Sequence, residues 1–240
     1  MRTKAYCITM RTTPERHERA RKLFESFDFP VTFHVAERDP QGGIYGCWRS
    51  HLACWDKAVE AGYDVIAVFE DDVEIPSRAE LDYLLEEGRR AFERQPDLEY
   101  IALHGKTIPV GTDQDAVKSG VAITTCAYMI HLPRFLRRGR ENIEPTGKHF
   151  DFDLYYNSKG PVYTKVGVFE PAPKIMPGIK FGTVNDYGVV LNTAFKIFGY
   201  GNVVSWMDLY INTLRCVPRK MRPWLRPFNE IGIKLFQPAR

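Results

Sequence analysis

The chain has 240 residues, and its 33 lysines and arginines against 30 acids leave a net charge of +3. This length allows one large domain or two small ones, with a substantial core. So small a net charge argues against a nucleic-acid-binding protein. The five cysteines lie apart in apolar runs, with no Cys-x-x-Cys pair and no Cys/His cluster that indicates zinc. They predict free thiols in a reducing compartment and argue against a disulfide framework.

Signals for targeting or membrane insertion are weak in this sequence. Residues 1–4 lead directly into an apolar, strand-like run, so we expect no signal peptide. No apolar stretch is long enough to span a bilayer. These features favour a cytoplasmic protein.

The C-terminal stretch has a different character from the rest. The stretch from Arg215 to Arg240 contains seven lysines and arginines but only one acid, Glu230, and aromatic residues are interleaved with them. This pattern suits contact with an anionic membrane surface, which would make the protein peripheral on the inner face of a membrane. A C-terminal helix packed on the core with a charged outer face is the alternative.

The first half of the chain alternates strand-like and helix-like segments. A short apolar strand is predicted at 5–9, followed by a helix that begins near Pro14 after two threonines that offer a hydroxyl cap. Alternating apolar residues predict a second strand at 31–35. A helix is predicted over 46–62, because its apolar residues share one face and its last residue is a glycine placed to end it.

The alternation continues through the middle of the chain. The apolar run at 65–69 has the length and β-branched content of a strand buried on both faces. Ser77 and Glu80 form a capping box that opens the next helix. Further strands are predicted at 100–103 and 121–130. We therefore expect an α/β fold with a mostly parallel, Rossmann-like sheet and helices on both faces.

The domain boundary is predicted late in the chain. From residue 141 onward, prolines and glycines multiply, which is typical of substrate-binding loops. We expect one domain over residues 1–188, followed by a basic, aromatic-rich extension over 189–240. In sheets of this kind, ligands bind beyond the carboxyl ends of the strands. Thr9, Met10 and Arg11 follow the first strand and so lie at that rim.

Three consecutive carboxylates, Glu70, Asp71 and Asp72, end the 65–69 strand. Adjacent acids repel one another and are costly to group unless a positive charge lies between them. A divalent cation carrying a phosphorylated ligand would supply that charge, because magnesium and manganese prefer hard oxygen ligands. The tip therefore predicts a metal site, and a solvated acidic turn is the alternative.

Four segments together resemble glycosyltransferase family 25, whose members include bacterial lipooligosaccharide galactosyltransferases and collagen galactosyltransferases. The similarity spans residues 4–185 and is carried most specifically by a Gly-Cys-x-x-Ser-His helix followed by a Glu-Asp-Asp strand tip. The four segments are Ala5–Met10, Gly46–Leu52, Phe69–Val73 and Ala127–Ile130.

The resemblance implies a GT-A type fold, a nucleotide-sugar donor and a divalent metal, Mn²⁺ or Mg²⁺, held by Asp72 together with Asp71. It implies transfer of a hexose with inversion, with uridine-diphosphate galactose as the expected donor and a surface glycan or lipid-linked oligosaccharide as the acceptor. The positions that it implies for contacts with the donor are Thr9, Met10, Arg11, Gly46, Ser50, His51, Glu70 and Asp71.

Each of these donor-contact candidates also has an ordinary structural alternative. Strand alternation turns Glu70 away from Asp71, so Glu70 either holds the strand tip or touches the ribose. Gly46 either lets the backbone approach a ligand or simply starts a helix. His51 contacts the nucleotide, contacts an acid such as Asp71, or is a satisfied core residue.

A second carboxylate site is predicted at Asp151 and Asp153, which alternate with aromatic residues. An inverting transfer needs a base near the acceptor hydroxyl, and either aspartate offers one. Helix capping is the alternative for both. Two rival functions also remain open for the whole chain: a nucleotidyltransferase on a similar sheet, and a glycan-binding module without catalysis.

Overall fold

The computed structural model describes residues 1–105, 107–109, 115–122, 125–138 and 166–178. The two candidate bases, Asp151 and Asp153, lie outside these residues, and so does the extension over 189–240. Within the described part of the chain, no helix is long and apolar enough to cross a membrane.

Strands and helices alternate along the described chain as the sequence predicts. In chain order they are β1 (Thr3–Met10), α1 (Pro14–Ser26), β2 (Thr32–Ala36), α2 (Gly43–Glu60), β3 (Val65–Glu70), β4 (Val73–Glu74), α3 (Arg78–Arg94), β5 (Tyr100–Ala102), β6 (Thr107–Pro109), β7 (Val117–Ala122), β8 (Ala127–His131), α4 (Leu132–Phe135), a 3₁₀ turn (Leu136–Arg138), β9 (Val166–Phe169) and β10 (Met176–Pro177).

Eight of the described strands form one sheet in the order β2-β1-β3-β8-β5-β9-β7-β6. Strand β1 pairs in parallel with β2 and β3, and β5 pairs in parallel with β9. Strands β8 and β7 pair antiparallel with their neighbours on both sides, so these two run against the other six. The predicted α/β class, with a mostly parallel, Rossmann-like sheet, is confirmed.

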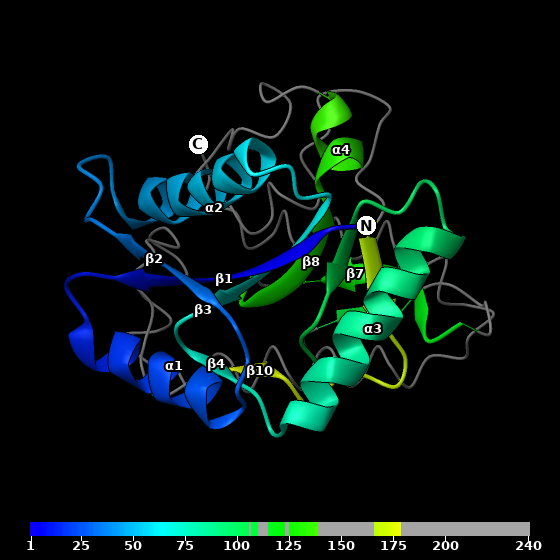
Figure 1. The fold of residues 1–240 in the computed structure, drawn as a ribbon, viewed down its shortest axis with the longest axis horizontal. Helices are drawn as coiled ribbons and strands as arrows, with labels where there is room; N and C mark the ends of the chain where they lie inside the picture. The colour runs from blue at the N-terminus through cyan, green and yellow to red at the C-terminus, as the bar shows by residue number, and fades with distance from the viewer. Residues whose placement is uncertain (106, 110–114, 123–124, 139–165, 179–240) are drawn as a thin grey trace, which may run out of the picture.

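Helices cover both faces of this sheet (Figure 1). Helices α2 and α4 lie on one face, and α1 and α3 lie on the other. The buried side chains divide accordingly into two clusters. One contains Phe24 of α1 and Leu81 of α3, and the other contains Trp55 of α2 and Phe135 of α4. Successive residues of β3 therefore alternate between two separate cores, because strand side chains point to opposite faces in turn.

The predicted single strand over 121–130 is wrong. The structure has two strands there, β7 and β8, and β7 lies at the far side of the sheet between β9 and β6. Strand β8 instead lies between β3 and β5. The apolar run is nearly continuous, and periodicity alone does not show where one strand stops and the next begins.

Helix boundaries follow local chemistry. Helix α2 begins at Gly43, one turn earlier than predicted, after Gly42 adopts a φ of 108° that other residues rarely take. Gly62, with a φ of 70°, follows its C-terminus as predicted. The Ser77 hydroxyl accepts a hydrogen bond from the Glu80 N–H at 3.1 Å. The predicted threonine cap of α1 is wrong, because the Thr13 hydroxyl donates to the Met10 carbonyl and caps no helical N–H.

Candidate functional site

Asp71 and Asp72 form the turn between β3 and β4, at the carboxyl end of β3. Strands β1, β2 and β3 are parallel, so their carboxyl ends lie at one edge of the sheet. Asp71 is buried, with 4% of its surface exposed, and the Asp72 side chain is 14% exposed. These carboxylates are therefore held in a largely dehydrated turn, and the alternative of a solvated acidic turn does not describe them.

The positive charge between these two acids is an arginine. Arg16, in the first turn of α1, forms an ion pair with the Asp71 carboxylate, and one of its nitrogens lies 3.3 Å from Asp72 Oδ2. Its side chain is 9% exposed. The sequence predicts a cation at this place but does not predict Arg16. The available signal was positional: α1 begins directly after β1, at the same edge of the sheet as the acids.

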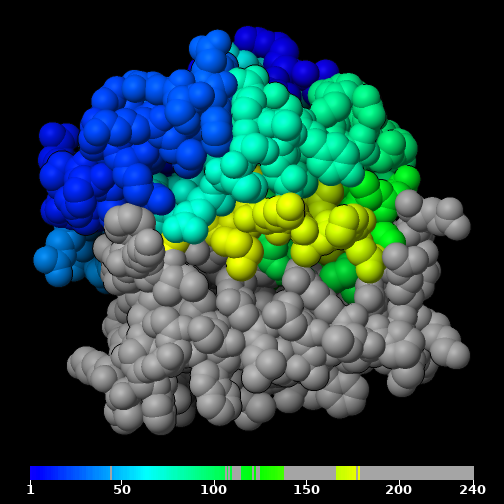
Figure 2. All heavy atoms as spheres, turned by 90° about the horizontal axis from the view of Figure 1, so that it is seen from below, coloured from blue at the N-terminus to red at the C-terminus, as the bar shows by residue number. Residues whose placement is uncertain are grey.

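A second arginine holds the backbone of the same turn. Arg19, one helical turn after Arg16, donates to the carbonyls of Asp71 and Val73 at 3.1 and 3.0 Å. From the other side, the Gly178 N–H donates to the Asp72 carbonyl at 2.7 Å. Strand β10 also pairs with β4, so residues 176–178 border the turn; Figure 2 shows the yellow part of the chain beside the cyan part. The acidic tip is fixed by two distant parts of the chain.

Two carboxylate oxygens at this tip remain available. Asp71 Oδ2 and Asp72 Oδ1 are buried, and neither has a hydrogen bond of good geometry with the residues that the structure describes, although the nearby Thr9 hydroxyl acts to lower the pKa of Asp71. Burial raises the pKa of Asp71, against the charge of Arg16. Burial, with repulsion from Glu70, raises the pKa of Asp72 to about 7. Buried acceptors without partners are costly, and a bound cation would satisfy both. The residues present therefore fit a divalent metal with oxygen ligands.

Glu70 belongs to the opposite face of the sheet. Its Oε1 accepts a hydrogen bond from the Thr125 hydroxyl at 2.6 Å and lies 3.7 Å from Nε2 of His51, on α2. Burial acts to raise the pKa of Glu70, but His51 and Thr125 outweigh it and the pKa is lowered. Glu70 thus points away from Asp71, as strand alternation predicts, and it contacts side chains of its own core.

His51 is buried and is oriented through its other ring nitrogen. Nδ1 lies 2.7 Å from the Tyr128 hydroxyl, which accepts a hydrogen bond from the Trp55 indole N–H at 2.9 Å. An indole nitrogen can only donate, so the Tyr128 oxygen is the acceptor in its contact with Trp55. The acid that His51 approaches is Glu70, and the predicted alternative of Asp71 is wrong. Trp55, Tyr128, His51, Glu70 and Thr125 form one continuous polar chain inside the protein.

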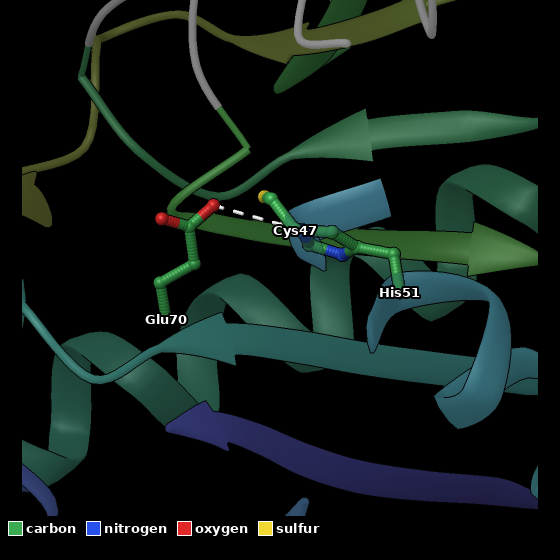
Figure 3. A group of neighbouring side chains, drawn as sticks. All are labelled: Cys47, His51 and Glu70. Carbon is green, nitrogen blue, oxygen red and sulfur yellow. Dashed lines mark ion pairs between the residues drawn. The ribbon is translucent and has the colours of Figure 1, made fainter. Parts of the chain in front are cut away.

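Cys47 completes a cluster that the sequence analysis passed over. It lies one helical turn before His51 on α2, and the ligand atoms of Cys47, His51 and Glu70 all lie within 4.8 Å of one another. Figure 3 shows the Cys47 sulfur and the His51 ring, both from α2, converging on the Glu70 carboxylate at the end of β3. The sequence showed no Cys/His cluster that indicates zinc, whereas the fold brings Cys47 and His51 together with Glu70. The signal was the i, i+4 spacing, which places both side chains on one helical face.

Two of the other donor-contact candidates, Arg11 and Ser50, have internal partners of their own. Arg11 is exposed and pairs with Glu37. The Ser50 hydroxyl donates to the Gly46 carbonyl at 2.6 Å. A Cβ at Gly46 would lie 3.0 Å from Asp39 Cβ, so the absence of a side chain there lets the preceding loop approach α2. Thr9 is buried at the end of β1, and Met10, its neighbour, is partly exposed. Contacts of these residues with a donor remain predictions.

Residues 40–119 match the model of glycosyltransferase family 25, described as an LPS biosynthesis protein. The family resemblance is confirmed. The matched segment holds the Gly-Cys-x-x-Ser-His helix and the acidic tip, so the family signature and the two clusters described above coincide. The family match supports transferase activity and leaves the transferred group open. A search of curated proteins returned no match.

Solved structures similar to the chain are distant. A mannose-1-phosphate geranyltransferase from Thermus thermophilus is 11% identical, with a TM-score of 0.41 over 73% of this chain and 75% of that one. A glycosyltransferase involved in the glycosylation of the major capsid of PBCV-1 is 12% identical, with a TM-score of 0.40 over 70% and 83%. A CMP:2-keto-3-deoxy-manno-octonic acid synthetase is 9% identical, with a TM-score of 0.34 over 61% and 80%. Structural similarity this distant does not indicate an activity for this chain.

Proposed function

We propose that this protein transfers a hexose from a nucleotide-sugar donor to a glycan acceptor, with a divalent cation held by Asp71 and Asp72. One observation carries the proposal. Within the segment that matches the family, the tip of β3 presents two buried carboxylate oxygens without hydrogen-bond partners among the described residues. Each such oxygen costs free energy on folding, so a bound cation that satisfies both would explain why the turn keeps them.

The bound cation would neutralise the charge that develops on the leaving nucleoside diphosphate. The chain's own residues hold the site ready for it. Arg16 holds both carboxylates close together, and Arg19 fixes the carbonyls of the turn. Since the site is largely dehydrated, each charge in it acts more strongly than it would in water. Preorganised charge of this kind is the main source of catalysis in group transfer from a diphosphate.

The finer features of the reaction follow the family resemblance and await a test. The donor that we propose is uridine-diphosphate galactose, and the acceptor is a surface glycan or a lipid-linked oligosaccharide. Asp151 or Asp153 would take the proton from the acceptor hydroxyl in an inverting transfer. Thr9, Met10, Arg11, Gly46 and Ser50 would line the donor site.

The basic extension over 189–240 would bring the enzyme to an anionic membrane surface. Each cation near such a surface contributes about 1 kcal/mol. We expect the full chain to sediment with anionic liposomes at low salt and to be released as salt is added. Equal sedimentation with neutral and with anionic liposomes would contradict this localisation. It would leave the proposed chemistry unaffected.

A donor panel tests the proposed function directly. The full chain is incubated with manganese and each of several nucleotide sugars, with and without glycan acceptors, and release of nucleoside diphosphate is measured. We expect slow donor hydrolysis without acceptor, fastest with uridine-diphosphate galactose, and none after chelation. Turnover of nucleoside triphosphates with release of pyrophosphate would instead identify a nucleotidyltransferase. No turnover of any donor, with glycan binding retained, would identify a binding module.

A further inference from the structure

Cys47, His51 and Glu70 bring a sulfur, an imidazole nitrogen and a carboxylate oxygen to one point. Two of these residues come from the first half of α2, and the third ends β3, so the cluster bridges two elements (Figure 3). Magnesium and manganese prefer oxygen ligands, whereas thiolate and imidazole ligands together favour zinc. The donor set therefore differs in kind from the one that Asp71 and Asp72 offer.

The distances are close to those of a tetrahedral zinc site. Zinc lies about 2.0–2.1 Å from nitrogen and oxygen ligands and about 2.3 Å from sulfur, which places the ligand atoms about 3.3–3.6 Å apart. His51 Nε2 and Glu70 Oε1 are 3.7 Å apart, and all three ligand atoms lie within 4.8 Å of one another. Binding an ion would require side-chain movements that bring the three atoms closer together.

The neighbours of the cluster hold its ligands in place. The Tyr128 hydroxyl contacts His51 Nδ1 and so turns Nε2 toward Glu70. The Thr125 hydroxyl holds the Glu70 carboxylate at 2.6 Å. In zinc sites, an imidazole ligand is usually oriented by a hydrogen bond to its other nitrogen, and a carboxylate ligand is hydrogen-bonded in turn. Both supports are present before any metal binds.

The site is accessible and is separate from the acidic tip. Cys47 is partly exposed, and the Glu70 side chain is 26% exposed, so an ion can reach the ligands from solvent. The cluster lies on the face covered by α2, whereas Asp71 contacts Arg16 of α1 on the opposite face (Figure 1). One thiolate and one carboxylate would balance the two charges of the ion.

We propose that Cys47, His51 and Glu70 bind one zinc ion, with the fourth coordination position open to water or to an oxygen of a bound ligand. The ion joins the first half of α2 to the carboxyl end of β3 and stiffens the rim at which the acidic tip lies. This proposal does not depend on the transferase reaction, because neither the ligands nor their orienting contacts include Asp72.

Cobalt substitution tests this site by its spectrum. The full chain is stripped with a chelator and titrated with Co²⁺, which gives a sulfur-to-metal charge-transfer absorption only when a thiolate is bound. We expect this band to reach its maximum at one cobalt per chain and to disappear when zinc is added. Cys47→Ser should abolish the band and lower zinc affinity at least about 10²-fold, since losing a direct ligand exceeds the 10–100-fold cost of losing an orienting residue.

Two control variants make the result specific. Cys54→Ala changes a buried thiol on the same helix that is not part of the cluster, and it should keep the band. Asp72→Asn removes the proposed manganese ligand and should also keep the band, even if donor turnover is lost. If the stripped wild-type chain shows no such band after Co²⁺ is added, the proposal is overturned. A band that survives in Cys47→Ser would also overturn it, because another thiol would then be the ligand.

Discussion

Glu70 and Asp71 are consecutive residues, yet their carboxylates serve opposite faces of the sheet. Glu70 lies beside His51 of α2, and Asp71 is paired with Arg16 of α1. The pleat of β3 therefore divides a single acidic motif between two environments. In one, a carboxylate meets a thiol and an imidazole. In the other, two carboxylates share an arginine and keep oxygens free for a hard cation.

Arg16→Met should destabilise the protein strongly. The arginine is buried with both aspartates, and removing one partner of a buried ion pair typically costs about 3–5 kcal/mol. Urea unfolding at neutral pH measures the loss. Arg21→Met is the matched control, because its ion pairs with Glu18 and Glu25 are exposed, and exposed pairs contribute about 1 kcal/mol or less. Equal effects of the two substitutions would mean that the acidic tip does not need its arginine.

The metal-free protein should become less stable as pH rises from about 4 to about 7. An ordinary aspartate titrates near pH 3.9 in the unfolded chain, whereas burial raises the pKa of Asp72 to about 7 in the folded chain. Between these values the folded state binds more protons, so the free energy of unfolding falls with increasing pH. Urea unfolding across this range measures the slope. Asp72→Asn should flatten it, and an unchanged slope would show that Asp72 is not its source.

Asp72→Asn should lower manganese-dependent donor turnover by at least about 10²-fold while leaving the fold intact. The change keeps the size of the side chain and removes the charge that a metal ligand needs. Glu74→Gln, two residues along the chain at an exposed position, is the control and should retain activity. Circular dichroism confirms that both variants fold. Full turnover in Asp72→Asn would remove this residue from the metal site.

Asp151→Asn or Asp153→Asn should lower transfer by about 10² to 10⁴, the usual contribution of a general base. Donor binding should survive, because the lost group faces the acceptor. Initial rates with a glycan acceptor and the donor affinity in its absence separate the two effects. If both variants transfer normally, the segment only caps a helix and the base is elsewhere.

Much of the architecture was accessible from the sequence because it depends on local patterns. The apolar run before Glu70 predicted a buried strand, and the parallel sheet then placed the acids at the ligand-binding edge. Helix starts were harder, because the Thr13 hydroxyl can either accept from a helical N–H or donate to a nearby carbonyl, and it donates to the Met10 carbonyl. The division of 121–130 between β7 and β8 depends on long-range pairing with β9 and β3, which no short window contains.

The site residues that sequence reasoning missed are those chosen by packing between elements. Arg16 reaches the acids only because α1 lies against the face of β3 from which Asp71 points. Cys47 and His51 share a helical face, which was visible, but their third partner is on a different strand. Spacing rules for zinc search within one segment, and they fail when a helix supplies two ligands and a distant strand end supplies the third.

The pairing of β10 with β4 has a consequence for how this chain folds. Met176 lies opposite Glu74, so the last support of the acidic turn comes from a part of the chain synthesised about a hundred residues later. Contacts between such distant residues are slow to form, because a long loop must close first. On the ribosome, the first three strands can assemble early, but the edge that carries the acidic turn stays incomplete until residue 178 has emerged. Competence to bind a donor should therefore appear late, as one of the final events of folding.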